Sequence, residues 1–174
     1  VTHLIVASCT GFVAPGVDQI LAQKLNLAPS VERLLVGFMG CYAAVSALRS
    51  ALHIVRSQPQ AKVLVVTVEL SCLHLNATQD IESLLAMLQF GDGAAAVVLR
   101  RNHPRYQLMG FSEHTDGELS ALLRIEPGGT REPFSPGFND WKRTYARVDA
   151  KKFSELINRV YLDAYTQVIE RACK

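Results

Sequence analysis

The stretch K-V-L-V-V-T-V-E-L, residues 62–70, is the clearest strand in the sequence, because it is rich in β-branched residues and almost continuously apolar. A run of this kind is expected in the middle of a sheet whose two faces are both covered. Its neighbours should therefore be helices. Strand-like and helix-like segments do alternate across the first hundred residues, and this alternation predicts an α/β layered fold.

Further strands are predicted from three other apolar runs, at residues 1–8, 31–38 and 94–99. The first run is suited to a strand buried on both faces. The last is also expected to be buried, and its small residues would let a neighbouring element approach closely.

Helices are predicted where apolar residues recur at helical spacing, over residues 15–25, 44–55, 80–88 and 153–172. In the first helix, Ile20, Leu21 and Leu25 should form the apolar stripe, and Asp18 lies in the first turn, where negative charge suits the helix dipole. The stripes of the next two helices should consist of Ala44, Val45, Leu48, Ala51, Leu52 and Val55, and of Ile81, Leu84, Leu85 and Leu88.

The segment from residue 101 to 149 differs from the rest, because it is polar and punctuated by prolines and by the Gly128-Gly129 pair. Its one apolar burst covers residues 119–125, which indicates a little strand content. A long excursion of this kind in a compact domain is usually functional or a lid. The glycine pair is best interpreted as a hinge or hairpin.

The composition is that of an ordinary folded protein, with 174 residues of which 49% are hydrophobic and 20% charged. The net charge is +2 and the basic residues are scattered, so we do not expect a nucleic-acid partner. The apolar runs are too short for a membrane helix, and the start does not resemble a signal peptide, so we expect a cytoplasmic protein. Because the first residues already form a strand without an initiator Met, we expect a piece of a longer protein.

The cysteines, Cys9, Cys41, Cys72 and Cys173, are widely separated and do not predict a zinc site or a disulfide scaffold. Cys41 is the candidate nucleophile, because G-F-M-G-C-Y at residues 37–42 places it between a strand and a helix. Backbone N–H groups and the helix dipole favour a thiolate at such a place and could polarise a thioester carbonyl. Cys41 as a small buried hydrophobe is the alternative, and the local pattern leaves both open.

A histidine partner for Cys41 is not evident from the sequence. His53 lies about three turns along the helix that follows Cys41, and His74 could approach a site at the strand ends. The motif F-G-D-G at residues 90–93 lacks the Lys and the Gly spacing of a phosphate-binding loop, so a structural turn braced by Asp92 is the better interpretation.

Four blocks in one order then carry a resemblance: S-C-T-G-F-x-A-P-G-V-D from Ser8, G-F-M-G-C-Y-A-A from Gly37, V-L-V-V-T-V-E-L from Val63 and F-G-D-G-A-A-A from Phe90. They resemble type III polyketide synthases of the chalcone synthase kind. The resemblance implies a thiolase-like layered fold with a mixed, mostly parallel sheet, here incomplete. It also implies coenzyme A thioesters as substrates without a further cofactor, and a homodimer.

The resemblance assigns roles to five residues. Cys41 matches the cysteine that takes the acyl group and is attacked by the carbanion of a decarboxylated malonyl thioester. Phe90 matches the aromatic gate between the pantetheine tunnel and the cavity. Ser71 and His74 fall where the family lines its elongation cavity, and Ala14 falls where a side chain projects across the dimer interface.

The tail from His114, with Tyr145, Asp149 and the helix at Phe153, is similar instead to ketoacyl synthase III enzymes, which use malonate on an acyl carrier protein. We therefore expect three parts: residues 1–100 from the N-terminal thiolase-like half, 101–150 as the excursion or lid, and 151–174 as the first helix of the C-terminal half. In both families the catalytic histidine and asparagine lie beyond the last residue of this sequence.

The sequence thus predicts an acyltransferase that forms carbon–carbon bonds by decarboxylative Claisen condensation, although this chain alone should be inactive in condensation because it lacks the His/Asn pair. Three alternatives remain open: a ketoacyl synthase III-type enzyme supplied by a carrier protein, a non-catalytic subunit that pairs with a condensing partner, and a thioester hydrolase that uses Cys41.

Overall fold

The computed structural model describes residues 1–75, 77–101, 106–117, 120, 123–124, 128, 130–137, 147–148 and 150–173. These residues divide into two compact units. The first unit comprises Val1–Leu73 and Asp92–Met109, and the second comprises His74–Gly91 and Gly110–Lys174. Predictions that involve Tyr145, Asp149 or Gly129 lie outside the described residues.

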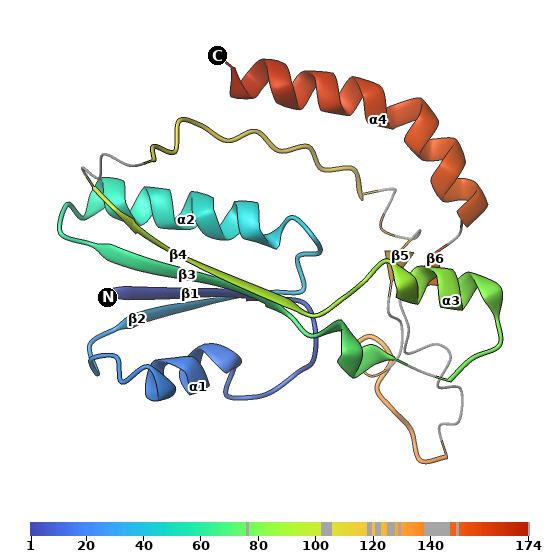
Figure 1. Cartoon of the computed structure of the whole chain (residues 1–174), viewed down its shortest axis with the longest axis horizontal. Helices are drawn as coiled ribbons and strands as arrows, with labels where there is room; N and C mark the ends of the chain where they lie inside the picture. Colours follow the sequence, from blue (N-terminus) through green and yellow to red (C-terminus); the bar gives the residue numbers. More distant parts are fainter. Residues whose placement is uncertain are drawn as a thin grey trace. The chain divides into compact units, whose positions relative to one another are not determined.

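The first unit is built on a four-stranded sheet with the strand order β2-β1-β3-β4 (Figure 1). Strands β1 (His3–Ser8), β2 (Glu32–Gly37) and β3 (Lys62–Glu69) are parallel, and β4 (Gly93–Arg100) runs antiparallel to β3. The predicted α/β class with a mixed, mostly parallel sheet is therefore confirmed.

Strand β1 lies at the centre of two hydrophobic clusters, one on each face of the sheet. Ile5 and Ala7 belong to the cluster beneath helix α2 (Ala43–Ser57), and Leu4 and Val6 belong to the cluster beneath helix α1 (Val17–Lys24). Because side chains of a strand alternate between faces, all four are buried, which confirms the predicted burial of this strand on both sides.

Helix α1 begins two residues later than predicted, and its buried face is different. Ile20 and Leu25 are exposed, whereas Asp18 and Ala22 are buried. Asp18 can be buried because Arg33 of β2 donates a hydrogen bond from Nη1 to its Oδ2 at 2.5 Å, so the charge is paired. The predicted stripe was wrong for Ile20 and Leu25, whereas Leu21 packs against the core as predicted. Spacing alone does not reveal the ion pair of Asp18.

Helix α2 approaches the sheet through small side chains. Its most buried positions recur every four residues, at Ala43, Ala47, Ala51 and Val55, with Ser46 beside them. Ala44 and Val45, which were predicted in the stripe, are only partly buried. A face of alanines lets the helix axis lie close to the strands, so this layer has little room for larger side chains.

Strand β4 forms as predicted, but its predicted burial is wrong. Ala94, Ala95 and Ala96 are exposed, as are Val97 and Val98, and only Leu99 is partly buried. Its one paired neighbour among the described residues is β3. The apolar composition of β4 thus produces an exposed apolar edge.

The second unit contains helix α3 (Ile81–Leu88), the short pair β5 (Leu123–Arg124) and β6 (Arg147–Val148), and helix α4 (Ala150–Ala172). Asp80 caps α3 by accepting a hydrogen bond from the Ser83 N–H at 2.9 Å, which confirms the predicted acidic start. The predicted stripe of α3 is exposed, with Leu88 81% accessible.

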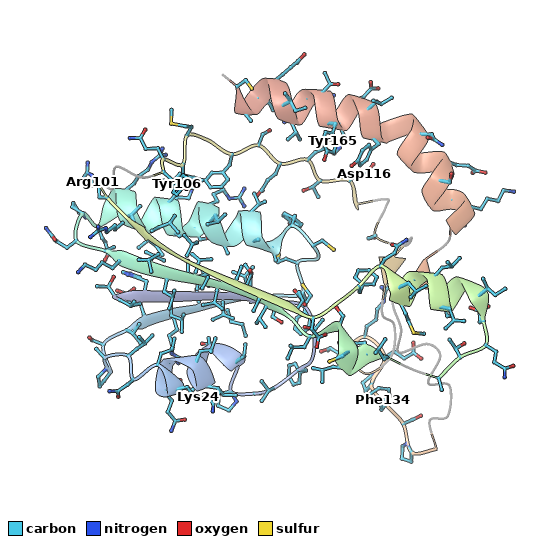
Figure 2. The ribbon with its side chains drawn as sticks, viewed as in Figure 1. Lys24, Arg101, Tyr106, Asp116, Phe134 and Tyr165 are labelled. Carbon is cyan, nitrogen blue, oxygen red and sulfur yellow. The ribbon has the colours of Figure 1, made fainter. Side chains whose placement is uncertain are left out.

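Helix α4 begins three residues before the predicted start and carries a pair of tilted tyrosine rings, Tyr161 and Tyr165, whose centroids are 4.7 Å apart. Figure 2 shows Tyr165 on this helix, together with Lys24 in the last turn of α1. The three-part division at residues 100 and 150 stays a prediction.

The close packing of α2 can be tested by Ala51→Leu. Ala51 is fully buried, so a leucine would force the helix away from the sheet and lower the free energy of unfolding by about 1–3 kcal/mol. The control is His53→Leu, at an exposed position of the same helix, where we expect a change within about 0.5 kcal/mol. Urea denaturation measures both, and equal effects would contradict the assigned packing.

Candidate active site

The candidate site lies at the edge of the sheet where the three parallel strands end. Ser8, the last residue of β1, is in register with Gly37, the last residue of β2, and Ala7 is in register with Thr67 of β3. The segments that follow these strands therefore begin side by side. Ligands of open α/β sheets bind outside the carboxyl ends of the strands, so this edge is the expected place for chemistry.

The turn after β2 presents Cys41. Phe38 and Gly40 both have positive φ, 58° and 79°, and reverse the chain between strand and helix. The Ala43 N–H donates to the Gly40 carbonyl oxygen at 3.1 Å, and α2 begins at Ala43, two residues after Cys41. Cys41 is exposed, so within the described chain it is not the small buried apolar residue of the alternative interpretation.

The helix that follows Cys41 begins without an acidic side chain. The first turn of α2 contains no acidic residue, and its N-cap residue, Tyr42, makes no side-chain hydrogen bond to the helix. The positive end of the helix dipole therefore faces the turn without a side-chain anion to neutralise it. The predicted place of Cys41 between strand and helix is confirmed, whereas its role stays a prediction.

The loop after β1 reaches the same turn. The backbone N–H of Cys9 donates to both carboxylate oxygens of Glu69, at 2.9 and 3.2 Å. The Thr10 hydroxyl oxygen accepts a hydrogen bond from the Leu70 N–H at 2.8 Å. Held in this way, Cys9 places its sulfur 3.7 Å from the carbonyl oxygen of Gly40, the residue before Cys41.

Sequence reasoning did not select Cys9 as a site residue. The signal was present, since Cys9 follows a buried parallel strand directly and the turn of Cys41 follows the next one. The contact itself depends on the Glu69 carboxylate, 60 positions later in the chain, which a local pattern does not reveal.

Asp92 braces the other side of the edge. Its Oδ1 accepts a hydrogen bond from the backbone N–H of Cys72 at 2.8 Å. The thiol of Cys72 also hydrogen-bonds to this carboxylate, which lowers the pKa of Asp92 and raises the pKa of Cys72. The predicted partner of Asp92 was wrong, because its carboxylate braces the helical turn Ser71–His74 instead of its own F-G-D-G turn.

The other predicted site residues are distributed over both units. Ser71 is partly buried and follows β3 in the first unit, and Ala14 is exposed in the loop after β1. His74 is partly buried and Phe90 is 42% exposed, and both belong to the second unit. The first unit thus brings the segments of Cys41, Cys9 and Ser71 to one edge, and the joint action of all five residues stays a prediction.

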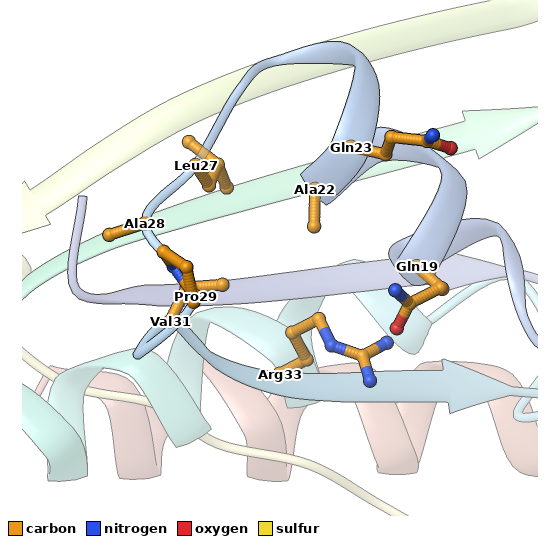
Figure 3. Close-up of a pocket in the computed structure, with 8 residues that line it drawn as sticks. All are labelled: Gln19, Ala22, Gln23, Leu27, Ala28, Pro29, Val31 and Arg33. Carbon is orange, nitrogen blue, oxygen red and sulfur yellow. The ribbon is translucent and has the colours of Figure 1, made fainter.

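A cavity of about 310 Å³ lies elsewhere, between α1 and the start of β2 (Figure 3). Gln19, Gln23 and Arg33 line it, and Arg33 is in register with Leu4 near the beginning of the strands. This cavity is therefore remote from the carboxyl edge.

Among the described residues there is no cluster of His, Cys, Asp or Glu that could hold a metal ion. A helix long and apolar enough to cross a membrane is also absent from that part of the chain.

Residues 1–103 match the family of chalcone and stilbene synthases, in its N-terminal domain. Among curated proteins, the α-pyrone synthesis polyketide synthase-like protein Pks18 of Mycobacterium tuberculosis is 45% identical over 120 residues, which are 69% of this chain and 30% of that relative. The match thus spans less than a third of the length of the relative.

Solved structures resemble the whole chain. A 3-oxoacyl-(acyl-carrier-protein) synthase III has a TM-score of 0.80 at 21% identity, over 100% of this chain and 53% of the other. The polyketide synthase PKS-I of the brown alga Ectocarpus siliculosus has a TM-score of 0.73 at 26% identity, over 100% of this chain and 44% of the other. The predicted thiolase-like fold is confirmed.

The turn that presents Cys41 can be tested by Gly40→Ala. An added Cβ would meet nothing within 4 Å, so the cost comes from the positive φ alone, and we expect a loss of about 1–2 kcal/mol in the free energy of unfolding. Gly91→Ala is the control, because Gly91 has equal space but no positive φ, and the expected change is within about 0.5 kcal/mol. Urea denaturation measures both variants. Similar losses of stability in the two would show that the positive φ of Gly40 does not cause the loss.

The contact between Asp92 and Cys72 can be tested by Asp92→Asn. Removing the carboxylate takes away the cause of the raised pKa, so Cys72 should ionise at lower pH and react faster with iodoacetamide. Peptide mapping by mass spectrometry across a pH series gives the rate for each cysteine. Asp80→Asn, at the cap of α3, is the matched control and should leave the Cys72 profile unchanged. An unshifted profile in Asp92→Asn would refute the assigned contact.

Proposed function

The chain belongs to the chalcone and stilbene synthase family, and on this premise we propose that Cys41 carries the acyl group of an acyltransferase that forms carbon–carbon bonds. In the proposed reaction, an acyl thioester and a malonyl thioester join by decarboxylative Claisen condensation. The observation that carries the proposal is the exposed thiol of Cys41 on the Gly40 turn, two residues before α2.

The first step is transfer of the acyl group to Cys41. The Cys41 thiolate attacks the carbonyl carbon of the acyl thioester, negative charge develops on the carbonyl oxygen, and the coenzyme A thiolate leaves. A helix N-terminus favours negative charge on a bound ligand, so the start of α2 suits both the thiolate and the developing oxyanion. The two groups that this proposed step uses, the Cys41 thiol and the start of α2, both lie in the first unit.

The second step is condensation. The malonyl thioester loses carbon dioxide, the resulting carbanion attacks the carbonyl of acyl-Cys41, and the Cys41 thiolate is released. Stabilising the enolate requires hydrogen-bond donors in a site that excludes water. We propose that a histidine and an asparagine of the complete enzyme supply these donors. The match to Pks18 covers 30% of that relative, which leaves most of the relative's length for further residues of the site.

Four further residues have proposed roles at this site. Phe90 is an apolar side chain at the end of α3 and is proposed as the gate that keeps water from the carbanion. Ser71 and His74, from the helical turn after β3, are proposed to line the cavity in which the chain grows. Ala14 is proposed to project towards the cavity of a partner subunit.

The proposed assembly is a cytoplasmic homodimer that takes its acyl group from coenzyme A. Exposure of Ala14 together with Phe12 and Val13 supports a partner at this loop, because large apolar side chains gathered on a surface mark interaction sites. The family match favours malonyl coenzyme A as the extender, and an acyl carrier protein is the alternative donor.

Acylation of Cys41 can be tested by intact-mass spectrometry after incubation with a panel of acyl-coenzyme A thioesters. We expect a mass gain equal to one acyl group, located at Cys41 by peptide mapping and abolished in Cys41→Ala. Cys173→Ala is the matched control, because Cys173 is also exposed, and this variant should keep the adduct. A mass gain that persists in Cys41→Ala would contradict the proposal.

The same experiment separates the alternatives. A non-catalytic subunit would give no adduct with any thioester, and its Cys41 would react slowly with thiol reagents. A thioester hydrolase would release free acid with water and without a malonyl thioester. Adding malonyl coenzyme A or malonyl carrier protein to the complete enzyme distinguishes the two extender donors by which one yields product.

A further inference from the structure

Cys9 and Cys41 belong to different loops but meet at one turn of the first unit. The Cys9 sulfur is 3.7 Å from the Gly40 carbonyl oxygen. A carbonyl oxygen lies about 2.8 Å from the next Cα across a planar trans peptide, so this sulfur is within about 6.5 Å of the Cys41 Cα. A disulfide requires Cα atoms about 4.4–6.8 Å apart. The sulfur-to-Cα distance is a different measure, so the Cα separation of this pair is part of the proposal, and rotation of both side chains about χ1 is needed to bring the two sulfurs together.

Hydrogen bonds to the end of β3 fix the position of Cys9. Its N–H is bound by both oxygens of Glu69, and the next residue, Thr10, accepts the Leu70 N–H. The loop of Cys9 is therefore tied to the end of β3 at two consecutive residues. An anchored thiol next to a second thiol has a high effective concentration for reaction with it.

Access also suits the pair. Cys41 is exposed and Cys9 is partly buried, so a small oxidant reaches Cys41 first. Cys72 is exposed too, but its thiol hydrogen-bonds to the carboxylate of Asp92. Cys72 is therefore the natural comparison within the same unit.

From this geometry we propose that Cys9 and Cys41 form a reversible disulfide when the protein meets a peroxide, with Cys9 as the resolving cysteine. In the first step the Cys41 thiolate attacks hydrogen peroxide, an S–O bond forms, the O–O bond breaks and hydroxide leaves. In the second step the Cys9 sulfur attacks the sulfenic acid of Cys41, the S–S bond forms and the oxygen leaves as water with the proton from Cys9. Two thiols and one peroxide thus give one disulfide and two waters.

The disulfide would prevent two other reactions of Cys41. It would block acyl transfer to Cys41, a consequence that rests on the proposed function. It would also protect Cys41 from further oxidation to the sulfinic acid, which thiols do not reverse. Formation of the bond itself depends only on the geometry, so its test is independent of any enzyme activity.

The sequence provides a matched control for this proposal. Cys9 and Cys41 are 32 positions apart, and Cys41 and Cys72 are 31 positions apart. Loop-closure entropy depends only weakly on loop length, so an unfolded chain would form the two disulfides in nearly equal amounts. Selectivity for the first pair can therefore come only from the fold.

The experiment treats the reduced 174-residue chain with a small excess of hydrogen peroxide at mildly alkaline pH, with and without guanidinium chloride, and maps the disulfides by non-reducing peptide mass spectrometry. Under native conditions we expect a mass loss of about 2 Da, reversed by dithiothreitol, and an excess of about tenfold or more of the Cys9–Cys41 bond over the Cys41–Cys72 bond. In guanidinium chloride the ratio should fall to about one.

Variants make the outcome decisive. Cys9→Ser should abolish the bond and let Cys41 gain about 32 Da as the sulfinic acid, whereas Cys72→Ser should leave the bond intact. Glu69→Ala, which frees the Cys9 N–H, should reduce the yield of the Cys9–Cys41 bond. Equal native and denatured ratios, a dominant Cys41–Cys72 bond, or unchanged Cys41 oxidation in Cys9→Ser would each overturn the proposal.

Discussion

The parallel pairing of β1 with β2 and β3 is the constraint on which the rest of the first unit depends. Through it, Ser8 is level with Gly37 and Ala7 with Thr67, so the three following segments start at one edge. Because side chains alternate between faces along a strand, a slip of one residue would turn Leu4 and Val6 away from α1 and towards α2. Burial of β1 on both faces therefore fixes the register, and the register brings the loop of Cys9 to the turn of Cys41.

Beyond the sheet, polar side chains hold the loops that hydrophobic packing does not reach. Glu69 binds the N–H of Cys9, Thr10 binds the N–H of Leu70, and Asp92 binds the N–H of Cys72. Each of these contacts joins segments at least 20 positions apart in the chain. Charged acceptors make stronger hydrogen bonds than neutral ones, so Glu69 and Asp92 are suited to fix exposed backbone that lacks a strand partner.

The sequence predicted the elements of the fold well because their patterns are local. The β-branched run at Lys62–Glu69 and the helical spacing within Ala43–Ser57 each produce one element without help from distant residues. The turn that presents Cys41 was also predictable, since Gly40 adopts the positive φ that a sharp reversal requires.

The features that were missed all depend on partners far along the chain. Asp18 is buried because Arg33 on the next strand neutralises it. The apolar strand β4 lies at the end of the sheet with most of its side chains exposed, a position within the described chain that composition does not reveal. The site role of Cys9 depends on Glu69. The sequence therefore predicted which residues form elements better than it predicted which residues meet.

Two acids at the carboxyl edge of the sheet, Glu69 and Asp92, act as structural anchors. The two carboxylate oxygens of Glu69 share the hydrogen bond from the N–H of Cys9. Asp92 accepts hydrogen bonds from Cys72, which lower its pKa. A carboxylate that is stabilised in its charged form is a weak base, so Asp92 is not suited to remove a proton from Cys41. The first turn of α2, which follows Cys41, contains no acidic residue that would oppose a negative charge of the proposed acyl transfer. In the proposed mechanism, the acyl group is carried by Cys41 in the first unit, whereas the enolate of the condensation step is assigned to a histidine and an asparagine of the complete enzyme.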